Sequence, residues 1–378
     1  MMFALAHGRI LIGASFVEGR AVLVEEGHIA AIVPEADIPA GTLVHDLGGQ
    51  MLVPGFIDTQ LNGGGGVLFN DNPAIDAIAA IGAAHRAFGT TGFLPTLISD
   101  DLEVIRRAVA AVDEAIHKGV PGVLGIHIEG PFLNPLRKGI HDGSKIRPLD
   151  DEGFSAITGL KRGRTLLTLA PERTTPMMVR RLADAGIIVA AGHSEASCAE
   201  VKLALDHGLT GFTHLFNAMS PLTAREPGVT GAALDDSRAW CGLIADGRHV
   251  DPVAMRVALR CKGPEKLMLV TDAMPSVGIA SKHFMLQGQR IEVIDGACVN
   301  QDGTLAGSDL DMGHAVRNAA AMLEVGLETA IQMASATPAA FLGLSHRTGR
   351  IAAGLAADLA ALDESGRVMQ SWIAGRTA

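Results

Sequence analysis

The sequence has 378 residues, of which 48% are hydrophobic, and it carries a formal net charge of −10 at pH 7. Such a composition predicts a globular protein with a large core, and its acidic balance argues against a nucleic-acid-binding surface. The four cysteines form no CxxC pair, and no apolar stretch reaches membrane-spanning length. We therefore expect a reduced, cytoplasmic protein that binds neither nucleic acid nor membrane.

Short β-like runs alternate with glycine-containing turns over residues 3–53. The same texture returns near the C-terminus, where Asp358–Leu362 and Val368–Ile373 flank a turn. We interpret 1–50 and 346–378 as two parts of one small β domain. Residues 51–345 would then form a larger domain that is inserted between them.

The middle of the chain alternates strand-like and helix-like segments. Met51–Asp58 reads as the first strand of a barrel, and the run Gly63–Gly66 after it lets backbone approach a site closely. Helices are predicted at 74–88 and 102–117, and residues 282–306 read as an inserted hairpin or flap. The alternation predicts an α/β fold, a (β/α)8 TIM-like barrel with a small β-sandwich built from both termini. A doubly wound open sheet is the alternative, but the sequence lacks the GxGxxG and GxxxxGK[ST] phosphate-binding motifs.

Four of the predicted strands end in residues that can bind a metal or a proton, namely Glu129, His193, His214 and Asp272. Parallel strands place their carboxyl ends at one edge of a sheet, where such folds bind ligands, so we expect these side chains to meet. Two imidazoles and one carboxylate with an open position resemble a catalytic zinc site. A lone histidine at a strand end is more often a hydrogen-bonding residue. Two of them on consecutive strand–helix units favour a metal hydrolase.

Ten short phrases match one family in order along nearly the whole chain. They are PGFIDTQLNGGGG (54–66), LGIHIEGPFLN (124–134), KGIH (138–141), TLAPE (168–172), AGHS (191–194), THLFNAM (213–219), REPG (225–228), ADGRHVD (245–251), LVTDA (269–273) and GTLAGS (303–308). With these phrases the chain resembles the N-acetylglucosamine-6-phosphate deacetylases of the amidohydrolase superfamily. The resemblance implies a homodimer that hydrolyses N-acetyl-D-glucosamine 6-phosphate to D-glucosamine 6-phosphate and acetate.

The resemblance also assigns roles to residues. It makes Glu129, His193 and His214 the metal ligands, and Asp272 the acid and base that takes a proton from the attacking water and returns one to the amine. His141 would stabilise the developing oxyanion. The implied substrate contacts are Ile140, His141, Asn217, Ala218, Arg225, Asp246, Gly247, Arg248, His249, Leu305, Ala306 and Gly307.

Some of these roles depend on the resemblance alone. Without it, His141 reads as a solvated loop histidine and Arg225 as a surface ion pair, whereas with it Arg225 offers a planar fork suited to phosphate. N-acetylgalactosamine-6-phosphate deacetylation, or another amidohydrolase activity, is the nearest alternative function. A non-catalytic scaffold is a remote one, because the ligands and the acid/base are all present.

The number of metal ions is predicted from a difference between this sequence and those of many amidohydrolases. Many amidohydrolases carry His-x-His after the first barrel strand to hold a second ion, whereas the corresponding phrase here is Asp58-Thr59-Gln60. The neutral amide of Gln60 is a weak ligand for zinc-like ions compared with imidazole. We therefore expect one divalent metal ion per subunit, zinc, with iron, cobalt or manganese as alternatives.

Overall fold

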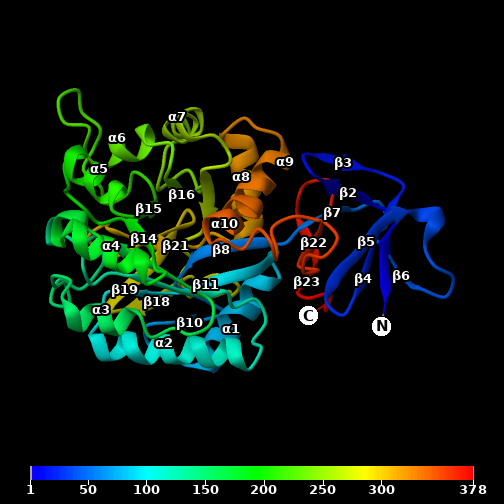
Figure 1. The fold of residues 1–378 in the computed structure, drawn as a ribbon, viewed down its shortest axis with the longest axis horizontal. Helices are drawn as coiled ribbons and strands as arrows, with labels where there is room; N and C mark the ends of the chain where they lie inside the picture. Colours follow the sequence, from blue (N-terminus) through cyan, green and yellow to red (C-terminus); the bar gives the residue numbers. More distant parts are fainter. Residues whose placement is uncertain (1, 378) are drawn as a thin grey trace.

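Eight parallel strands form the centre of the molecule. A computed structural model describes residues 2–377, and the order of strands in its largest sheet follows the order of the chain. The sheet curls until its last strand approaches its first, where Leu61 pairs with Ala273 in a parallel bridge. The predicted (β/α)8 barrel is therefore confirmed (Figure 1). Its strands are β8 (Phe56–Leu61), β11 (Thr90–Ile98), β12 (Gly125–Glu129), β13 (Arg164–Leu169), β14 (Ile188–Ala191), β15 (Leu209–Phe212), β16 (Trp240–Ile244) and β17 (Leu267–Val270).

Helices cover the outside of this barrel (Figure 1). In α2 (Leu102–His117), Leu102, Ile105, Val109 and Val112 recur at helical spacing and are all buried, so one face of the helix packs on the strands. No helix between residues 2 and 377 is long and apolar enough to cross a membrane. The other helices are α1 (Ile75–Arg86), α3 (Asp151–Ile157), α4 (Pro176–Asp184), α5 (Cys198–Asp206), α6 (Gly228–Asp235), α7 (Pro252–Lys262), α8 (Met312–Met322), α9 (Leu327–Ala334) and α10 (Ala336–Phe341).

Two smaller sheets pack on each other beside the barrel, at the right of Figure 1. Leu5 and Val22 of one sheet share a buried cluster with Leu52, Leu359 and Trp372 of the other. The second sheet joins strands from both ends of the chain, which confirms the predicted β-sandwich built from both termini. The first has the order β5-β4-β1-β6, with β1 (Phe3–Ala6), β4 (Arg20–Glu25), β5 (His28–Pro34) and β6 (Leu43–Asp46). The second has the order β23-β22-β7-β2-β3, with β2 (Arg9–Ile12), β3 (Ser15–Val17), β7 (Met51–Pro54), β22 (Leu359–Leu362) and β23 (Val368–Trp372).

The predicted strand Met51–Asp58 divides into two strands of different sheets. β7 pairs with β2 and β22 in the small sheet, whereas β8 opens the barrel. Gly55 lies between them, and its N–H donates to the carbonyl oxygen of Asp358 at 2.9 Å. A Cβ at Gly55 would lie 2.1 Å from Thr91 Oγ1, so the chain needs glycine to pass this point. The barrel therefore begins after this glycine and not at the start of the apolar run.

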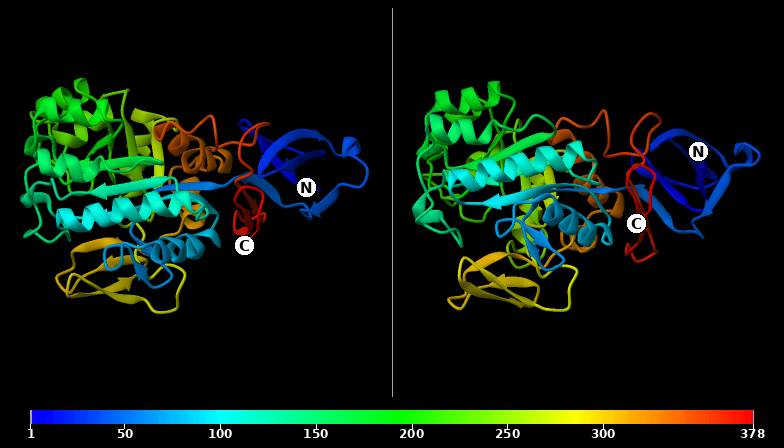
Figure 2. Two further views of the ribbon diagram at one scale, coloured as in Figure 1. Left: turned by 60° about the horizontal axis from the view of Figure 1, so that its bottom comes forward. Right: turned by 90° about the horizontal axis from the view of Figure 1, so that it is seen from below.

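The flap predicted at 282–306 is a four-stranded antiparallel sheet, and Figure 2 shows it projecting below the barrel in yellow to orange. Leu286, Ile291 and Cys298 from this sheet pack with Met274, which follows β17. The flap is thus anchored beside the carboxyl ends of the barrel strands. Its strands are β18 (His283–Leu286), β19 (Gln289–Ile294), β20 (Ala297–Val299) and β21 (Leu305–Ser308), and a separate short hairpin consists of β9 (Gly63–Gly64) and β10 (Val67–Leu68).

Candidate active site

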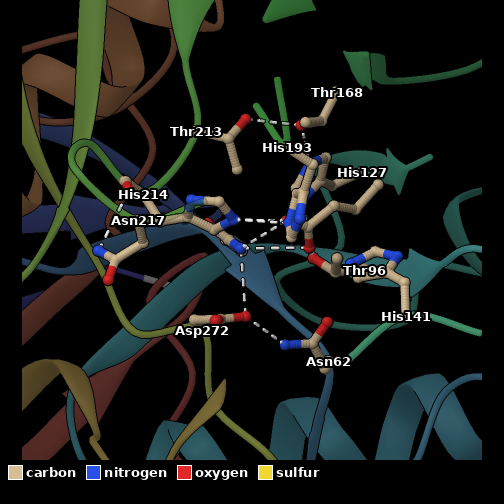
Figure 3. A network of polar contacts seen from close by, with 12 residues as sticks. Asn62, Thr96, His127, His141, Thr168, His193, Thr213, His214, Asn217 and Asp272 are labelled. Carbon is tan, nitrogen blue, oxygen red and sulfur yellow. Dashed lines mark hydrogen bonds and ion pairs between the residues drawn. The ribbon is translucent and has the colours of Figure 1, made fainter. Parts of the chain in front are cut away.

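The three predicted metal ligands converge at the carboxyl end of the barrel, and Figure 3 shows His193 and His214 side by side there. Glu129 is the last residue of β12, and His193 and His214 follow β14 and β15. His193 Nε2 and His214 Nε2 lie 3.2 and 2.9 Å from Glu129 Oε1, and 3.0 Å from each other. All three side chains are buried and form a group that could hold a metal ion.

The donor atoms of this cluster fit a divalent cation. His193 Nδ1 donates to the carbonyl oxygen of Arg137 at 2.8 Å, which leaves a free lone pair on Nε2. Ligand atoms around a tetrahedral zinc-type ion, with bonds of about 2.0–2.1 Å, lie roughly 3.3 Å apart, close to the spacing here. Burial opposes ionisation of Glu129, but the neighbouring imidazoles of His193 and His214 favour the charged carboxylate and hold its pKa well below its usual range.

Asp272 lies beside the cluster and is held by two side-chain amides. Gln60 Nε2 donates to Asp272 Oδ1 at 3.1 Å and to the two Glu129 oxygens at 3.3 and 3.2 Å. Asn62 Nδ2 donates to the same Asp272 oxygen at 2.6 Å. Burial, and then the neighbouring Glu129 charge, raises the pKa of Asp272 to about 6. Its carboxyl group is therefore suited to exchanging a proton near neutral pH.

Gln60 and Asn62, and not Asp58, lie beside the cluster of predicted ligands at the end of the first barrel strand. Gln60 and Asn62 both reach Asp272, whereas the buried carboxylate of Asp58 accepts hydrogen bonds from the Thr271 hydroxyl and the Gln60 backbone N–H. Asp58 therefore ties β8 to β17 and does not face the metal ligands. In this part of the chain, the side chains that approach the predicted ligands and Asp272 are therefore the neutral amides of Gln60 and Asn62.

His141 is a neutral hydrogen-bond donor in the wall of the site. Ser99 donates its backbone N–H to His141 Nδ1 at 3.2 Å, and the Ser99 hydroxyl lies 2.8 Å from the same nitrogen. Because a backbone N–H can only donate, Nδ1 is the acceptor and Nε2 carries the ring proton. Burial, reinforced by the nearby His193, lowers the pKa of His141 to about 3. The uncharged ring can therefore donate one hydrogen bond from Nε2, as oxyanion stabilisation requires.

These groups line a single cavity of about 450 Å³, a volume within the range of small-molecule sites. The cavity brings together the predicted metal ligands, Asp272 and the predicted contacts Ile140, His141, Asn217, Ala218, His249, Leu305, Ala306 and Gly307. Its lining also includes residues that the sequence prediction does not contain, namely Asn62, Ile98, Leu136, Arg137, Gly139, Ile244, Met274, Gly303 and Thr304. These are common residue types in cores and loops, and only their position in the fold distinguishes them.

Four predicted substrate contacts are not part of this lining. Asp246 accepts hydrogen bonds from His249 Nδ1 at 2.6 Å and from the backbone N–H groups of Arg248 and His249 at 2.8 Å, so it orients His249 at the cavity wall. Gly247 turns the chain here with a φ of 71°. Arg248 is exposed and pairs with an aspartate of the flap at 3.5 Å. Arg225 is exposed in the loop before α6.

The backbone is strained where the site residues leave their strands. His193, His214 and Asp272 each lie two residues after a barrel strand and have φ values of 50°, 33° and 53°. Ala218, also in the cavity wall, has a φ of 50°. Non-glycine residues rarely adopt such left-handed values, so the surrounding structure must hold them. Strain of this kind concentrates at functional sites.

Comparison with known proteins agrees with this geometry. Residues 51–378 match the amidohydrolase family, and residues 2–52 match the NagA composite domain. A relative from Shewanella sp. (strain ANA-3), named N-acetylgalactosamine-6-phosphate deacetylase, is 43% identical over 370 residues, which cover 97% of this chain and 93% of the relative. A relative from Haemophilus influenzae, named N-acetylglucosamine-6-phosphate deacetylase, is 35% identical over 379 residues, with 100% and 99% covered.

Solved structures show the same relationship. The N-acetylglucosamine-6-phosphate deacetylase from Pasteurella multocida has a TM-score of 0.96 and 34% identity to this chain, with 100% of both chains covered. The one from Mycobacterium smegmatis has a TM-score of 0.90 and 33% identity, again over 100% of both chains. Since the match spans the barrel that carries the Glu129, His193 and His214 cluster, the chain belongs to the amidohydrolase family.

Proposed function

We propose that this amidohydrolase removes the acetyl group of N-acetyl-D-glucosamine 6-phosphate, giving D-glucosamine 6-phosphate and acetate. One observation carries the proposal: a metal-ligand cluster, the carboxyl of Asp272 and the neutral imidazole of His141 line one cavity. Amide hydrolysis needs a Lewis acid, a proton acceptor that later becomes a donor, and a hydrogen bond to the oxyanion. The names of the relatives from Haemophilus and Pasteurella support the choice of substrate.

The residues divide the chemistry between them. A divalent metal held by Glu129, His193 and His214 would supply Lewis-acid chemistry. Asp272 would accept the proton of the attacking water and then deliver a proton to the departing amine nitrogen. The Nε2–H of His141 would donate to the developing oxyanion, a contribution of about 3 kcal/mol for one good donor.

The substrate contacts are proposed from their positions. Asn217, the backbone of Ala218, the flap backbone at 305–307 and Ile140 all line the cavity and would hold the sugar. His249 would bind the phosphate from the cavity wall. Asp246, Gly247 and Arg248 would support His249 through the turn that they form. Arg225 would add a guanidinium that binds the same phosphate.

We also propose one zinc ion per subunit and a cytoplasmic homodimer. Two imidazoles and a carboxylate suit zinc, although iron, cobalt and manganese can use the same ligands. The group found among residues 2–377 has three ligands, which suits a catalytic rather than a structural ion, because catalytic zinc keeps an open position.

A second candidate substrate is N-acetyl-D-galactosamine 6-phosphate, because the relative with 43% identity carries that name. Acetate release should be measured on both phosphorylated sugars and on N-acetyl-D-glucosamine without phosphate. The proposal expects the highest kcat/KM on the phosphorylated gluco sugar. A higher kcat/KM on the galacto sugar would move the assignment to that substrate, and no acetate release from either phosphorylated sugar would refute both.

A further inference from the structure

Four buried polar side chains form a continuous series of hydrogen bonds through the barrel interior, beside the metal ligands (Figure 3). Thr96 Oγ1 lies 3.1 Å from His127 Nδ1, and His127 Nε2 lies 2.8 Å from Thr168 Oγ1. Thr168 Oγ1 lies in turn 2.6 Å from Thr213 Oγ1. None of the four is more than 6% exposed. We name this series the threonine–histidine chain.

The threonine–histidine chain connects the strands that carry the ligands. His127 lies two residues before Glu129 on β12, so both side chains point into the barrel. Thr213 directly precedes His214. His127 uses both ring nitrogens within the chain, and none of its four members lines the substrate cavity. Its members therefore act on the site through the strands and not by touching the substrate.

Gly192 makes the last hydrogen bond of the threonine–histidine chain possible, the one between Thr168 and Thr213. Thr168 belongs to β13 and Thr213 follows β15, and β14 runs between these two strands. Gly192, next to the ligand His193, lies in the gap: a Cβ there would be 2.7 Å from Thr168 Cγ2 and 3.2 Å from Thr213 Cβ. Any larger residue would push the two threonines apart. The glycine of the Gly192-His193 pair thus lets two hydroxyls meet across an intervening strand.

The four side chains of the threonine–histidine chain are polar, and this needs a reason in a barrel interior. The interior of a TIM-type barrel is usually filled by branched apolar side chains, which need no partners. Buried hydroxyl and imidazole groups cost free energy unless each is hydrogen-bonded. What hydrogen bonds provide, and apolar packing does not, is a preferred distance and direction between strands. Such control matters where the strands must present ligand atoms to one ion.

We propose that the threonine–histidine chain positions the metal ligands by fixing the separation of the strands that bear Glu129 and His214. The inference rests on the proposed metal-dependent function. Metal–ligand distances tolerate deviations of only about 0.2 Å, so a small change in strand separation should weaken metal binding. Thr168 is the critical member, because its hydroxyl bonds both His127 and Thr213.

Three variants of neighbouring threonines test this. Thr168→Val removes the hydroxyl with little change in shape, and Thr168→Ser keeps the hydroxyl. Thr165→Val is the matched control, because Thr165 is on the same strand, is 4% exposed and is not part of the chain. The dissociation constant of zinc is measured by competition with a chelator, and the Tm of each metal-free protein is recorded beside it. We expect Thr168→Val to raise the zinc Kd about tenfold or more, and the other two variants to stay within about twofold of wild type.

An unchanged zinc Kd in Thr168→Val, even with a lower Tm, would show that the hydroxyl only stabilises the fold and would overturn the inference. If Thr168→Val does not fold, Thr213→Val removes the other hydroxyl of the same bond and carries the same expectation. The zinc measurement needs no substrate. Failure of the wild-type protein to release acetate would therefore refute the proposed function, whereas the positioning role of the threonine–histidine chain is decided by the zinc affinities alone.

Discussion

The Nε2 atoms of His193 and His214 lie 3.0 Å apart, and each also lies close to one oxygen of Glu129. His193 is fixed from its far side by the Arg137 carbonyl, whereas His214 Nδ1 has no partner among residues 2–377. A cation placed between the two rings would accept one lone pair from each Nε2 and would also bind the Glu129 carboxylate. The arrangement of the two rings is therefore that of a site built for a positive ion.

The first prediction is that the purified protein contains one tightly bound metal ion per chain. Beside the predicted ligands, Gln60 and Asn62 offer only neutral amides, which already donate to Asp272 and are weak ligands for zinc-like ions. Elemental analysis of protein prepared without added metal measures the ratio. Two tightly bound equivalents, with activity following the second, would contradict it.

Asp272→Asn should lower kcat by about 10² to 10⁴ while metal content stays at the wild-type level. The amide of asparagine has nearly the shape of the carboxylate but cannot accept the proton of the attacking water. Steady-state kinetics and metal analysis on the same preparation separate the two effects. Near-normal kcat would remove Asp272 from the mechanism.

The activity of the wild-type enzyme should fall as the pH falls through the pKa of Asp272. Burial raises this pKa to about 6 in the metal-free site, and a bound cation favours the carboxylate, so the acidic limb of kcat/KM should lie at or below pH 6. Only the ionised form of Asp272 accepts a proton, so kcat/KM should fall, and not rise, as the pH is lowered. A pH–rate profile measures the limb, and activity that rises on acidification would rule out this role.

Arg225→Ala should raise KM for the phosphorylated sugar and leave the weak activity on the unphosphorylated sugar unchanged. A guanidinium binds phosphate through paired, charge-assisted hydrogen bonds, and these exist only when the substrate carries phosphate. Arg225 is exposed and is not part of the cavity wall, so this comparison decides whether it has any role in binding. Equal, small effects on both sugars would identify it as a surface residue.

Asp58 should make stability fall as the pH rises. Burial raises the pKa of this carboxyl to about 7, so the folded protein holds the proton more tightly than the unfolded chain does, and the stabilisation present at low pH is lost as the pH approaches 7. Asp58→Asn removes the titration. Relative to wild type, the variant should gain roughly 2 kcal/mol in unfolding free energy between pH 5 and pH 7 in denaturant titrations. A difference in unfolding free energy between variant and wild type that stays constant from pH 5 to pH 7 would refute the raised pKa of Asp58.

The meeting of the three predicted metal ligands could be foreseen from the sequence because each is a polar residue at the end of a short apolar run. Parallel strand–helix units bring such ends together whatever the details of packing, and Glu129, His193 and His214 meet as expected. Asn62 and Thr168 could not be found in this way. Amides and hydroxyls are frequent in strands and loops, and their roles arise from contacts between distant segments, such as the closure of β8 on β17.

Helices α6 and α7 show the limits of local patterns. α7 carries a readable start, since Asp251 caps the N–H of Val253 and Pro252 takes the first helical position. α6 begins at Gly228 directly after Pro227, a pair that is more typical of a turn, and its helical conformation depends on burial in the fold. The break at Gly55 does have a signal in the sequence, because the Pro54-Gly55 pair interrupts the apolar run, but the prediction of one strand over Met51–Asp58 does not use it.

The pairing of β7 has a consequence for how the protein is made. One edge of β7 pairs with β2, which is synthesised before it, but the other edge pairs with β22, which leaves the ribosome about 300 residues later. The nascent chain therefore carries an open strand edge at the entrance to the barrel while all eight barrel strands are produced. That edge is closed only when β22 emerges, after all eight barrel strands, so the segment that leads into β8 is secured after the barrel has been synthesised and not before it.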